Sequence, residues 1–157
     1  MLDFKIEEKE LNTVYSLEFG KGEVIGVYKL YDGIEDHIGI KFKDHPRLKY
    51  FSVRSANKFR LSSSLTVLNQ ALVDLGRKIH SEDFNFDLRN YSHYVESLDI
   101  LFVINSIAHL ISQERLSEES KRMLTLCIDS LVLEVSHAYN TSERKAKGIV
   151  KDHMRCA

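Results

Sequence analysis

A change of texture near residue 60 constrains this chain more than any other feature of its sequence. Before it, β-branched and aromatic residues are interrupted by glycine, and five of the seven glycines occur by residue 39. After it, glycine becomes rare and apolar residues recur at every third or fourth position. A period of two is typical of strands and a period between three and four is typical of helices. The sequence therefore predicts an α+β protein whose strands precede its helices.

Turn signals divide the first region, residues 1–60, into short strands. Asp32-Gly33 predicts a tight hairpin turn between GEVIGVYKLY and DHIGIKFK, and DHPR at 44–47, with the only proline, predicts the next turn. Roughly four or five short antiparallel strands are expected to curl into a small SH3-like or Tudor-like barrel, because closure protects the edges of a sheet. We therefore expect a β-barrel domain over residues 1–60.

The second region, residues 61–157, carries signals for about five helices in an all-α bundle. One of Ser62, Ser63 and Ser64 can cap a helix that ends between Gly76 and His80. Its apolar stripe is Leu65, Leu68, Leu72, Leu75 and Ile79. A later helix can begin at Ser97 or Asp99. Asn140-Thr141 is expected to begin the last helix, with Glu143 in the position of a capping box.

The segment LSEESKRMLTLCIDSLVLEV at 116–135 is a strongly apolar helix candidate. Ser117 can cap it, and two glutamates follow in its first turn, where the peptide dipoles favour negative charge. Apolar residues then recur at helical spacing and predict a buried position in the bundle: Leu124, Cys127, Ile128, Leu131, Val135 and Ala138. Lys121 and Arg122 are needed neither to start this helix nor to bury it in the bundle. They belong either to a solvated rim or to a contact surface.

Composition and charge exclude several classes of protein. With 157 residues, 43% of them hydrophobic, and a formal charge of -1, the chain is typical of a globular protein without bulk affinity for nucleic acid. The apolar run ILFVI at 100–104 is too short to span a bilayer, and the N-terminal stretch is charged, so we expect a cytoplasmic protein without a membrane partner. Cys127 and Cys156 are expected to be reduced thiols.

The sequence gives little sign of catalysis. The seven histidines occur singly, without the close pairs of a zinc site, and Gly20-Lys21-Gly22 lacks the glycines and the following helix of a phosphate cradle. We therefore expect no metal site, no cofactor, no catalytic residues and no small-molecule substrate. A small enzyme would need a pocket that the sequence does not reveal.

Local charge is more informative than net charge. Seven cations crowd one part of the β region against Asp44: Lys41, Lys43, Arg47, Lys49, Arg54, Lys58 and Arg60. They form either a binding patch or an edge that lysine protects against aggregation. A second basic set occurs in the last helix and is interpreted as a solvated polar face: Arg144, Lys145, Lys147, Lys151 and Arg155.

Three stretches resemble the CarD/CdnL family of bacterial transcription regulators. LSEESKRMLTLCIDSLVLEVSHAYNTSERKAKGIV is similar to the C-terminal signature of that family, with Ser120 in place of its usual glutamate. NKFRLSSSLTVLNQAL resembles the junction between its two domains, and VYSLEFGKGEVIGV resembles its opening strands. The resemblance covers nearly the whole chain.

The resemblance implies a function. In this family, a Tudor-like N-terminal domain binds the β subunit of RNA polymerase, and the helical domain contacts promoter DNA at the upstream edge of the transcription bubble, which stabilises the open complex. Such DNA contacts are weak and largely independent of sequence, and tethering to the polymerase raises their effective concentration. We expect a monomer with these two partners. The rival hypothesis is a protein–protein adaptor that uses the barrel without contacting DNA.

The resemblance also implies particular contact residues. For the polymerase they are Lys29, Phe51, Ser52, Val53 and Arg54, although Phe51 and Val53 can instead point into the barrel. For DNA they are Arg89, Lys121 and Arg122 together with an aromatic wedge. The family usually has tryptophan as its wedge, and this chain has no tryptophan, so Phe86 or Phe84 is the substitute. Burial of either ring among the helices is the competing explanation.

Overall fold

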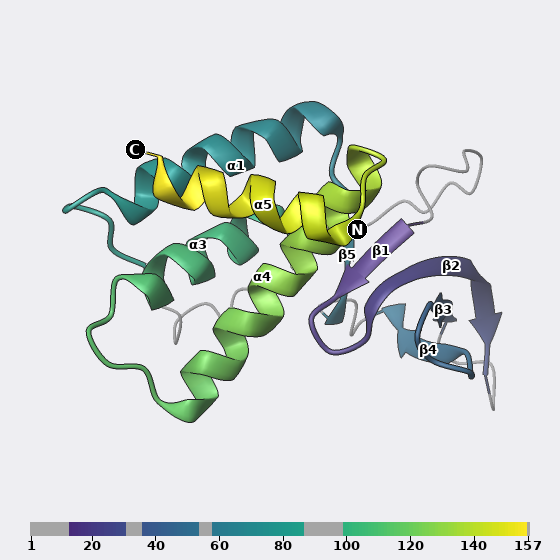
Figure 1. Ribbon diagram of the computed structural model, residues 1–157. Helices are drawn as coiled ribbons and strands as arrows, with labels where there is room; N and C mark the ends of the chain where they lie inside the picture. Colours follow the sequence, from purple (N-terminus) through teal and green to yellow (C-terminus); the bar gives the residue numbers. More distant parts are fainter. Residues whose placement is uncertain (1–12, 31–35, 54–57, 87–98, 157) are drawn as a thin grey trace.

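The computed structural model describes residues 13–30, 36–53, 58–86 and 99–156, with a β-sheet followed by helices (Figure 1). The strands are β1 (Thr13–Ser16), β2 (Gly20–Lys29), β3 (Asp36–Phe42), β4 (Lys49–Ser52) and β5 (Arg60–Leu61). They form one sheet in the order β4-β3-β2-β1-β5, with antiparallel neighbours. The α+β class is confirmed. Within the described residues no pairing joins β4 to β5, so the closed barrel is not confirmed.

The hairpin predicted between β2 and β3 forms. Its register runs from Gly22 opposite Phe42 to Lys29 opposite Asp36, with a bulge between Val24 and Gly26. The expected Asp32-Gly33 turn lies outside the described residues. The predicted turn at 44–47 connects β3 to β4. There Lys41 Nζ donates to the carbonyl oxygens of His45 at 3.1 Å and Pro46 at 2.6 Å, so this lysine stabilises the turn.

Four helices occur in the described residues: α1 (Leu65–Ile79), α3 (Ile100–Ile111), α4 (Glu118–Ala138) and α5 (Glu143–Arg155). The count of about five is therefore not confirmed. Three caps are serines or aspartate at predicted positions, because a side-chain oxygen there accepts a hydrogen bond from an orphan backbone N–H: Ser64, Asp99 and Ser117.

The predicted start of the last helix is wrong by two residues. Ser142 caps α5 by accepting from the Lys145 backbone N–H at 3.3 Å. Asn140 instead ends α4, since its φ of 49° is the left-handed conformation that closes helices and that asparagine tolerates. The Thr141 N–H then donates to the Ser136 carbonyl oxygen at 2.9 Å. The polar residues in this turn therefore divide between two helix ends.

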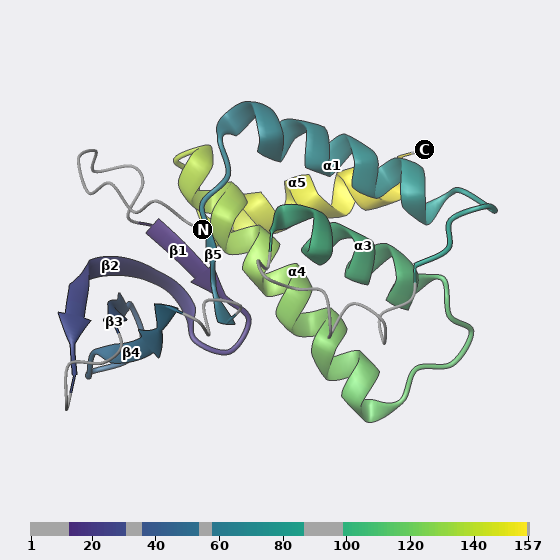
Figure 2. The same cartoon turned by 180° about the vertical axis from the view of Figure 1, so that it is seen from behind.

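The helices share one core, and the sheet packs at its side (Figure 2). The C-terminal half of α4 lies beside β1 and β2, so this helix borders both parts of the molecule (Figures 1 and 2). Most of the predicted α1 stripe is buried, but Leu65 is 51% exposed because it stands at the first position of the helix. No helix in the described part of the chain is long and apolar enough to cross a bilayer.

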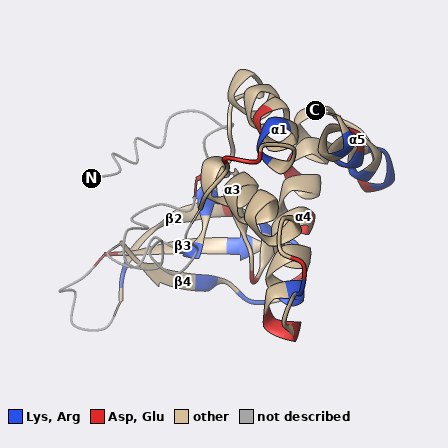
Figure 3. Ribbon diagram, turned by 90° about the vertical axis from the view of Figure 1, so that its left-hand side faces the viewer, with Lys and Arg blue, Asp and Glu red and all other residues tan. Residues whose placement is uncertain are grey.

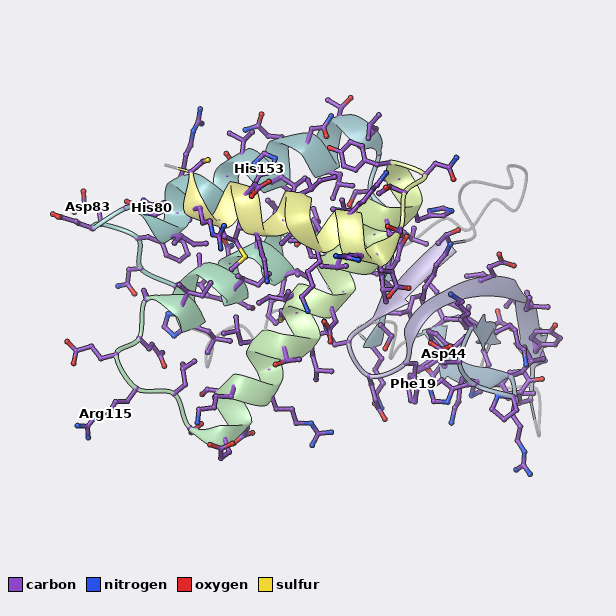
Figure 4. All side chains as sticks on the ribbon, viewed as in Figure 1. Phe19, Asp44, His80, Asp83, Arg115 and His153 are labelled. Carbon is purple, nitrogen blue, oxygen red and sulfur yellow. The ribbon has the colours of Figure 1, made fainter. Side chains whose placement is uncertain are left out.

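Gly76 allows α5 to cross closely over α1. A methyl group at this position would lie 2.5 Å from the His153 carbonyl oxygen and would also collide with the carbonyl oxygen of Cys156. Beside the crossing, His80 Nε2 lies 3.1 Å from the Met154 carbonyl oxygen, and Figure 4 places His80 and His153 at this end of the molecule. The helix end predicted between Gly76 and His80 is confirmed, because α1 ends at Ile79 with His80 as its C-cap.

Candidate functional site

Arg60 joins the sheet to the helices. Its guanidinium forms a buried ion pair with Glu134 of α4, and the two side chains are 3% and 2% exposed. Arg60 Nη2 also donates to Ser130 Oγ at 3.2 Å, while Glu134 Oε1 accepts from the Ser63 backbone N–H at 2.6 Å. A buried ion pair is tolerated when further hydrogen bonds satisfy both partners. Arg60 is thus a junction residue, and its assignment to an exposed basic patch is wrong.

Tyr15 completes this junction from β1. The Arg60 guanidinium carbon lies 4.9 Å from the centre of the Tyr15 ring, close enough for a cation–π contact. Burial raises the pKa of the Tyr15 hydroxyl, and the nearby Glu134 carboxylate raises it further. The local sequence pattern did not mark Glu134, Ser130 or Tyr15 as junction residues. The available signal was an acid within the apolar run LVLEV, because a buried carboxylate needs a partner.

The structure brings three of the polymerase-contact candidates to one end of the sheet. Lys29 lies opposite Asp36 in the β2–β3 register, and the next residue, His37, lies opposite Ser52 of β4. Val53 follows Ser52 directly and is 42% exposed. Lys29 is exposed as well. Arg54 lies outside the described residues.

Phe51 is not available as a surface contact, because it is only 7% exposed and belongs to the core of the sheet. Its ring packs against Phe42, Phe59 and Phe19, with centroid distances of 6.2, 5.4 and 6.1 Å. Figure 4 labels Phe19 and Asp44 in this part of the molecule. Phe51 therefore points into the core, as one of the two predicted alternatives has it. Val53 does not, because it is exposed.

Exposed apolar side chains occur on both faces of the sheet at β2 and β4. Ile25, Val27 and Tyr50 are 51%, 42% and 43% exposed, in addition to Val53. Val27 lies opposite Ile38, which lies opposite Phe51, so this row of the sheet passes from its core to its surface. By the same register Tyr50 lies on the other face, where its ring contacts that of Tyr28. We call Val27, Lys29 and Val53 the sheet-end surface. β4 is also an edge strand, with no further strand beside it in the described residues.

Several cations of the β region have structural partners. Besides Lys41 and buried Arg60, Lys49 places its Nζ 5.0 Å from the centre of the Phe19 ring. Lys43, Arg47 and Lys58 are exposed. An open depression of about 250 Å³ is lined by two strands of the sheet: Lys21, Gly22 and Glu23 of β2, with Lys41 and Lys43 beyond them. Three of the seven predicted cations, Lys41, Lys49 and Arg60, therefore have contacts within the fold.

Both wedge candidates contact the helical core. Phe86 is only 8% exposed, and its ring lies 6.2 Å from that of His109. Phe84 is half-buried against the same core, stacked on Phe86 at 6.5 Å with Lys78 Nζ 5.7 Å from its ring centre. The structure thus favours burial over an exposed wedge, because both rings complete the packing between α1 and α3. Arg89 lies outside the described residues.

Lys121 and Arg122 are exposed at the start of α4. Lys121 Nζ lies 2.6 Å from Glu118 Oε1, an ion pair three residues apart on the helix surface. Such exposed pairs are weak and leave the cation able to exchange partners. The predicted cap and acidic first turn of α4 are observed, so both cations are positioned at a defined helix end.

Neither thiol nor imidazole chemistry stands out in the described residues. Cys127 and Cys156 are both free, and burial raises the pKa of the Cys127 thiol to about 12, which makes it a poor nucleophile. No group of three or more histidine, cysteine, aspartate or glutamate side chains in the described ranges could hold a metal ion.

Comparison with known protein families and with curated proteins gave no match for this chain.

Proposed function

We propose that this protein is a transcription regulator of the CarD/CdnL type. In this proposal the sheet is a Tudor-like domain that binds the β subunit of RNA polymerase, and the helices contact promoter DNA at the upstream edge of the bubble. The observation that carries the proposal is the sheet-end surface. Exposed apolar side chains beside an unpaired edge strand favour a protein partner, because a sheet edge can accept a further strand.

The junction supports a function that uses both parts of the molecule. The ion pair between Arg60 and Glu134 fixes β5 against α4, and α4 carries Lys121 and Arg122 at its other end. A partner held at the sheet-end surface would therefore meet the helices in a defined orientation. Tethering in this way raises the effective concentration of weak phosphate contacts.

A protein–protein adaptor is the second candidate function, and the burial of Phe86 specifically favours it. A wedge must leave the protein core to enter a base step. Phe86 is packed among helices and Phe84 is stacked on it, so neither ring is presented for insertion. In the regulator, the DNA contact then rests on the cations of the helices.

Capture of the polymerase β subunit by the full chain tests the protein contact. Lys29→Glu and Val53→Glu should each weaken capture by about tenfold, the effect expected of a contact charge or a desolvated apolar residue. Arg115→Glu, an equal or larger charge change on the exposed loop before α4, is the control and should have no effect. Unchanged capture with both sheet variants would remove the proposed surface.

The lifetime of promoter open complexes separates the two candidate functions. Lys121→Ala combined with Arg122→Ala should shorten the lifetime at low salt without changing capture of the β subunit, because phosphate contacts are screened by salt. Arg115→Ala serves as the matched control. If the protein is only an adaptor, the wild type and every variant should capture the β subunit. None of them should change the open-complex lifetime relative to polymerase alone.

A further inference from the structure

Four cations form a single line along α5: Arg144, Lys147, Lys151 and Arg155. Their spacing of three, four and four residues confines them to about 80° of the helix circumference and extends over about 16 Å. All four are exposed, while α5 buries Ala146 and Val150 on another side. Figure 3 shows the basic side of α5 turned away from the sheet. We call these four residues the α5 stripe.

None of the α5 stripe residues forms an ion pair or a side-chain hydrogen bond within the described part of the chain. Other exposed cations differ in this respect. Lys121 pairs with Glu118 and Arg77 lies 3.8 Å from Asp74. Two acids of α5 stand at helical spacing from the stripe, Glu143 four residues before Lys147 and Asp152 three residues before Arg155, but no ion pair forms between them. The stripe therefore keeps four exposed positive charges without a formed ion pair.

Helix stability does not explain this row. Like charges three or four residues apart repel one another along the helix surface. Arg144 also stands in the first turn, where the helix dipole disfavours positive charge, and only Arg155 in the last turn is favoured by it. Glu143, four residues before Lys147, offsets only part of this repulsion. A row of exposed cations of this kind indicates an anionic partner.

We propose that the α5 stripe binds the phosphate backbone of a DNA duplex. A straight row of cations matches a linear polyanion, and Gly148 beside the row has no neighbouring atom within 4 Å of its added Cβ, which permits close approach. A protein interface needs an apolar centre, and none of the exposed large apolar residues lies on α5. A membrane-surface helix needs an exposed apolar side, which α5 buries.

This inference deepens the proposed function and shares with it the class of partner, but it concerns a different surface. Figures 1 and 2 show α5 beside the C-terminal half of α4, away from the end that carries Lys121 and Arg122. A duplex on the α5 stripe would lie on a second side of the helices. It would add contacts that do not depend on base sequence, since backbone phosphates are the same at every step.

Fluorescence anisotropy with a labelled duplex of arbitrary sequence tests the inference on the full chain without polymerase. Replacing all four residues of the α5 stripe by glutamine should weaken binding at low salt at least about tenfold and reduce the salt slope of log K by roughly 2 to 4. The control has the same charge change on exposed cations elsewhere: Arg47→Gln, Lys58→Gln, Arg77→Gln and Arg115→Gln. It should retain the wild-type slope. If the fourfold variant fails to fold, Lys147→Gln with Lys151→Gln should show about half the effect on the slope.

Each outcome decides the inference. Equal losses in the stripe variant and the control would reduce the effect to net charge and overturn it, as would absence of wild-type binding at low salt. Binding to anionic phosphatidylserine vesicles that depends on the stripe, without binding to duplex DNA, would assign the surface to membranes and also overturn it. Stripe-dependent DNA binding by a protein that captures no polymerase β subunit would uphold the inference while the proposed function fails.

Discussion

The sheet and the helices differ in how their cores are closed. Among the described residues, the helical core contains 17 buried residues and the sheet core 7, three of them phenylalanine, so the described sheet is the smaller and more dependent part. The helices bury their apolar faces against one another. The sheet depends in addition on α4, because a buried ion pair fixes β5 to that helix. A division at residue 60 would cut through β5 and leave Arg60 without its partner. The change of sequence texture therefore does not coincide with a break in packing.

Removing Glu134 should give the largest loss. Glu134→Ala leaves the buried Arg60 guanidinium uncompensated, which is expected to lower the free energy of unfolding by about 4 kcal/mol. The combined variant Arg60→Met with Glu134→Leu removes both charges and should recover most of that loss. Denaturant unfolding followed by circular dichroism measures both. Equal destabilisation by the single and combined variants would show that the charges are not what joins the sheet to α4.

Truncating Phe86 tests the opposite side of the comparison, the helical core. Phe86→Ala should lower the free energy of unfolding by about 3 kcal/mol, because it leaves a cavity between helices, and Phe84→Ala should cost less because Phe84 is half-buried. Phe86→Leu is the conservative control and should cost less stability than Phe86→Ala. A Phe86→Ala protein with wild-type stability and shortened open-complex lifetimes would instead restore the wedge.

Local chemistry made the helix ends predictable, and long-range packing limited the rest. Ser117 and Asp99 cap their helices as predicted, since a cap depends on residues within one turn. Arg60 looked like a surface cation because its partner Glu134 is 74 residues away. Phe86 stands in the polar stretch FNFDLR, so the sequence left its burial and an exposed wedge as open alternatives. Its burial depends on α1 and α3, whose positions a local pattern cannot specify.

Two glycine replacements test how closely α5 packs on α1. Gly76→Ala should destabilise the protein by about 2 kcal/mol, because the new methyl group collides with backbone carbonyls at the end of α5. Gly148→Ala places the same methyl group in open space on α5 and should stabilise by about 0.5 to 1 kcal/mol through helix propensity. Thermal unfolding of the two variants is the measurement. Changes of the same sign would contradict the close crossing of α1 and α5.

The smallest expected effect is a pH dependence at the contact between α4 and the sheet. Burial holds the pKa of His137 below its ordinary value of 6.5, and Lys21 lowers it further, while Glu134 and Glu23 oppose the shift. Below pH 6.5 the unfolded chain therefore binds a proton at this histidine more readily than the folded chain does. The associated stability is complete above that pH and is lost as the pH falls through the lowered folded pKa.

His137→Gln should therefore lose less stability than the wild type between about pH 7.5 and pH 5.5, with little difference at the higher pH. Lys21→Gln should give an intermediate profile, because it removes one of the two causes of the shift and leaves burial in place. Urea midpoints at the two pH values measure both variants against the wild type. Because His137 is exposed at the C-terminal end of α4, solvent screens the interaction and the difference should be small. Identical profiles for all three proteins would mean that His137 binds protons alike in the folded and unfolded chain, with no electrostatic contribution from the facing lysine.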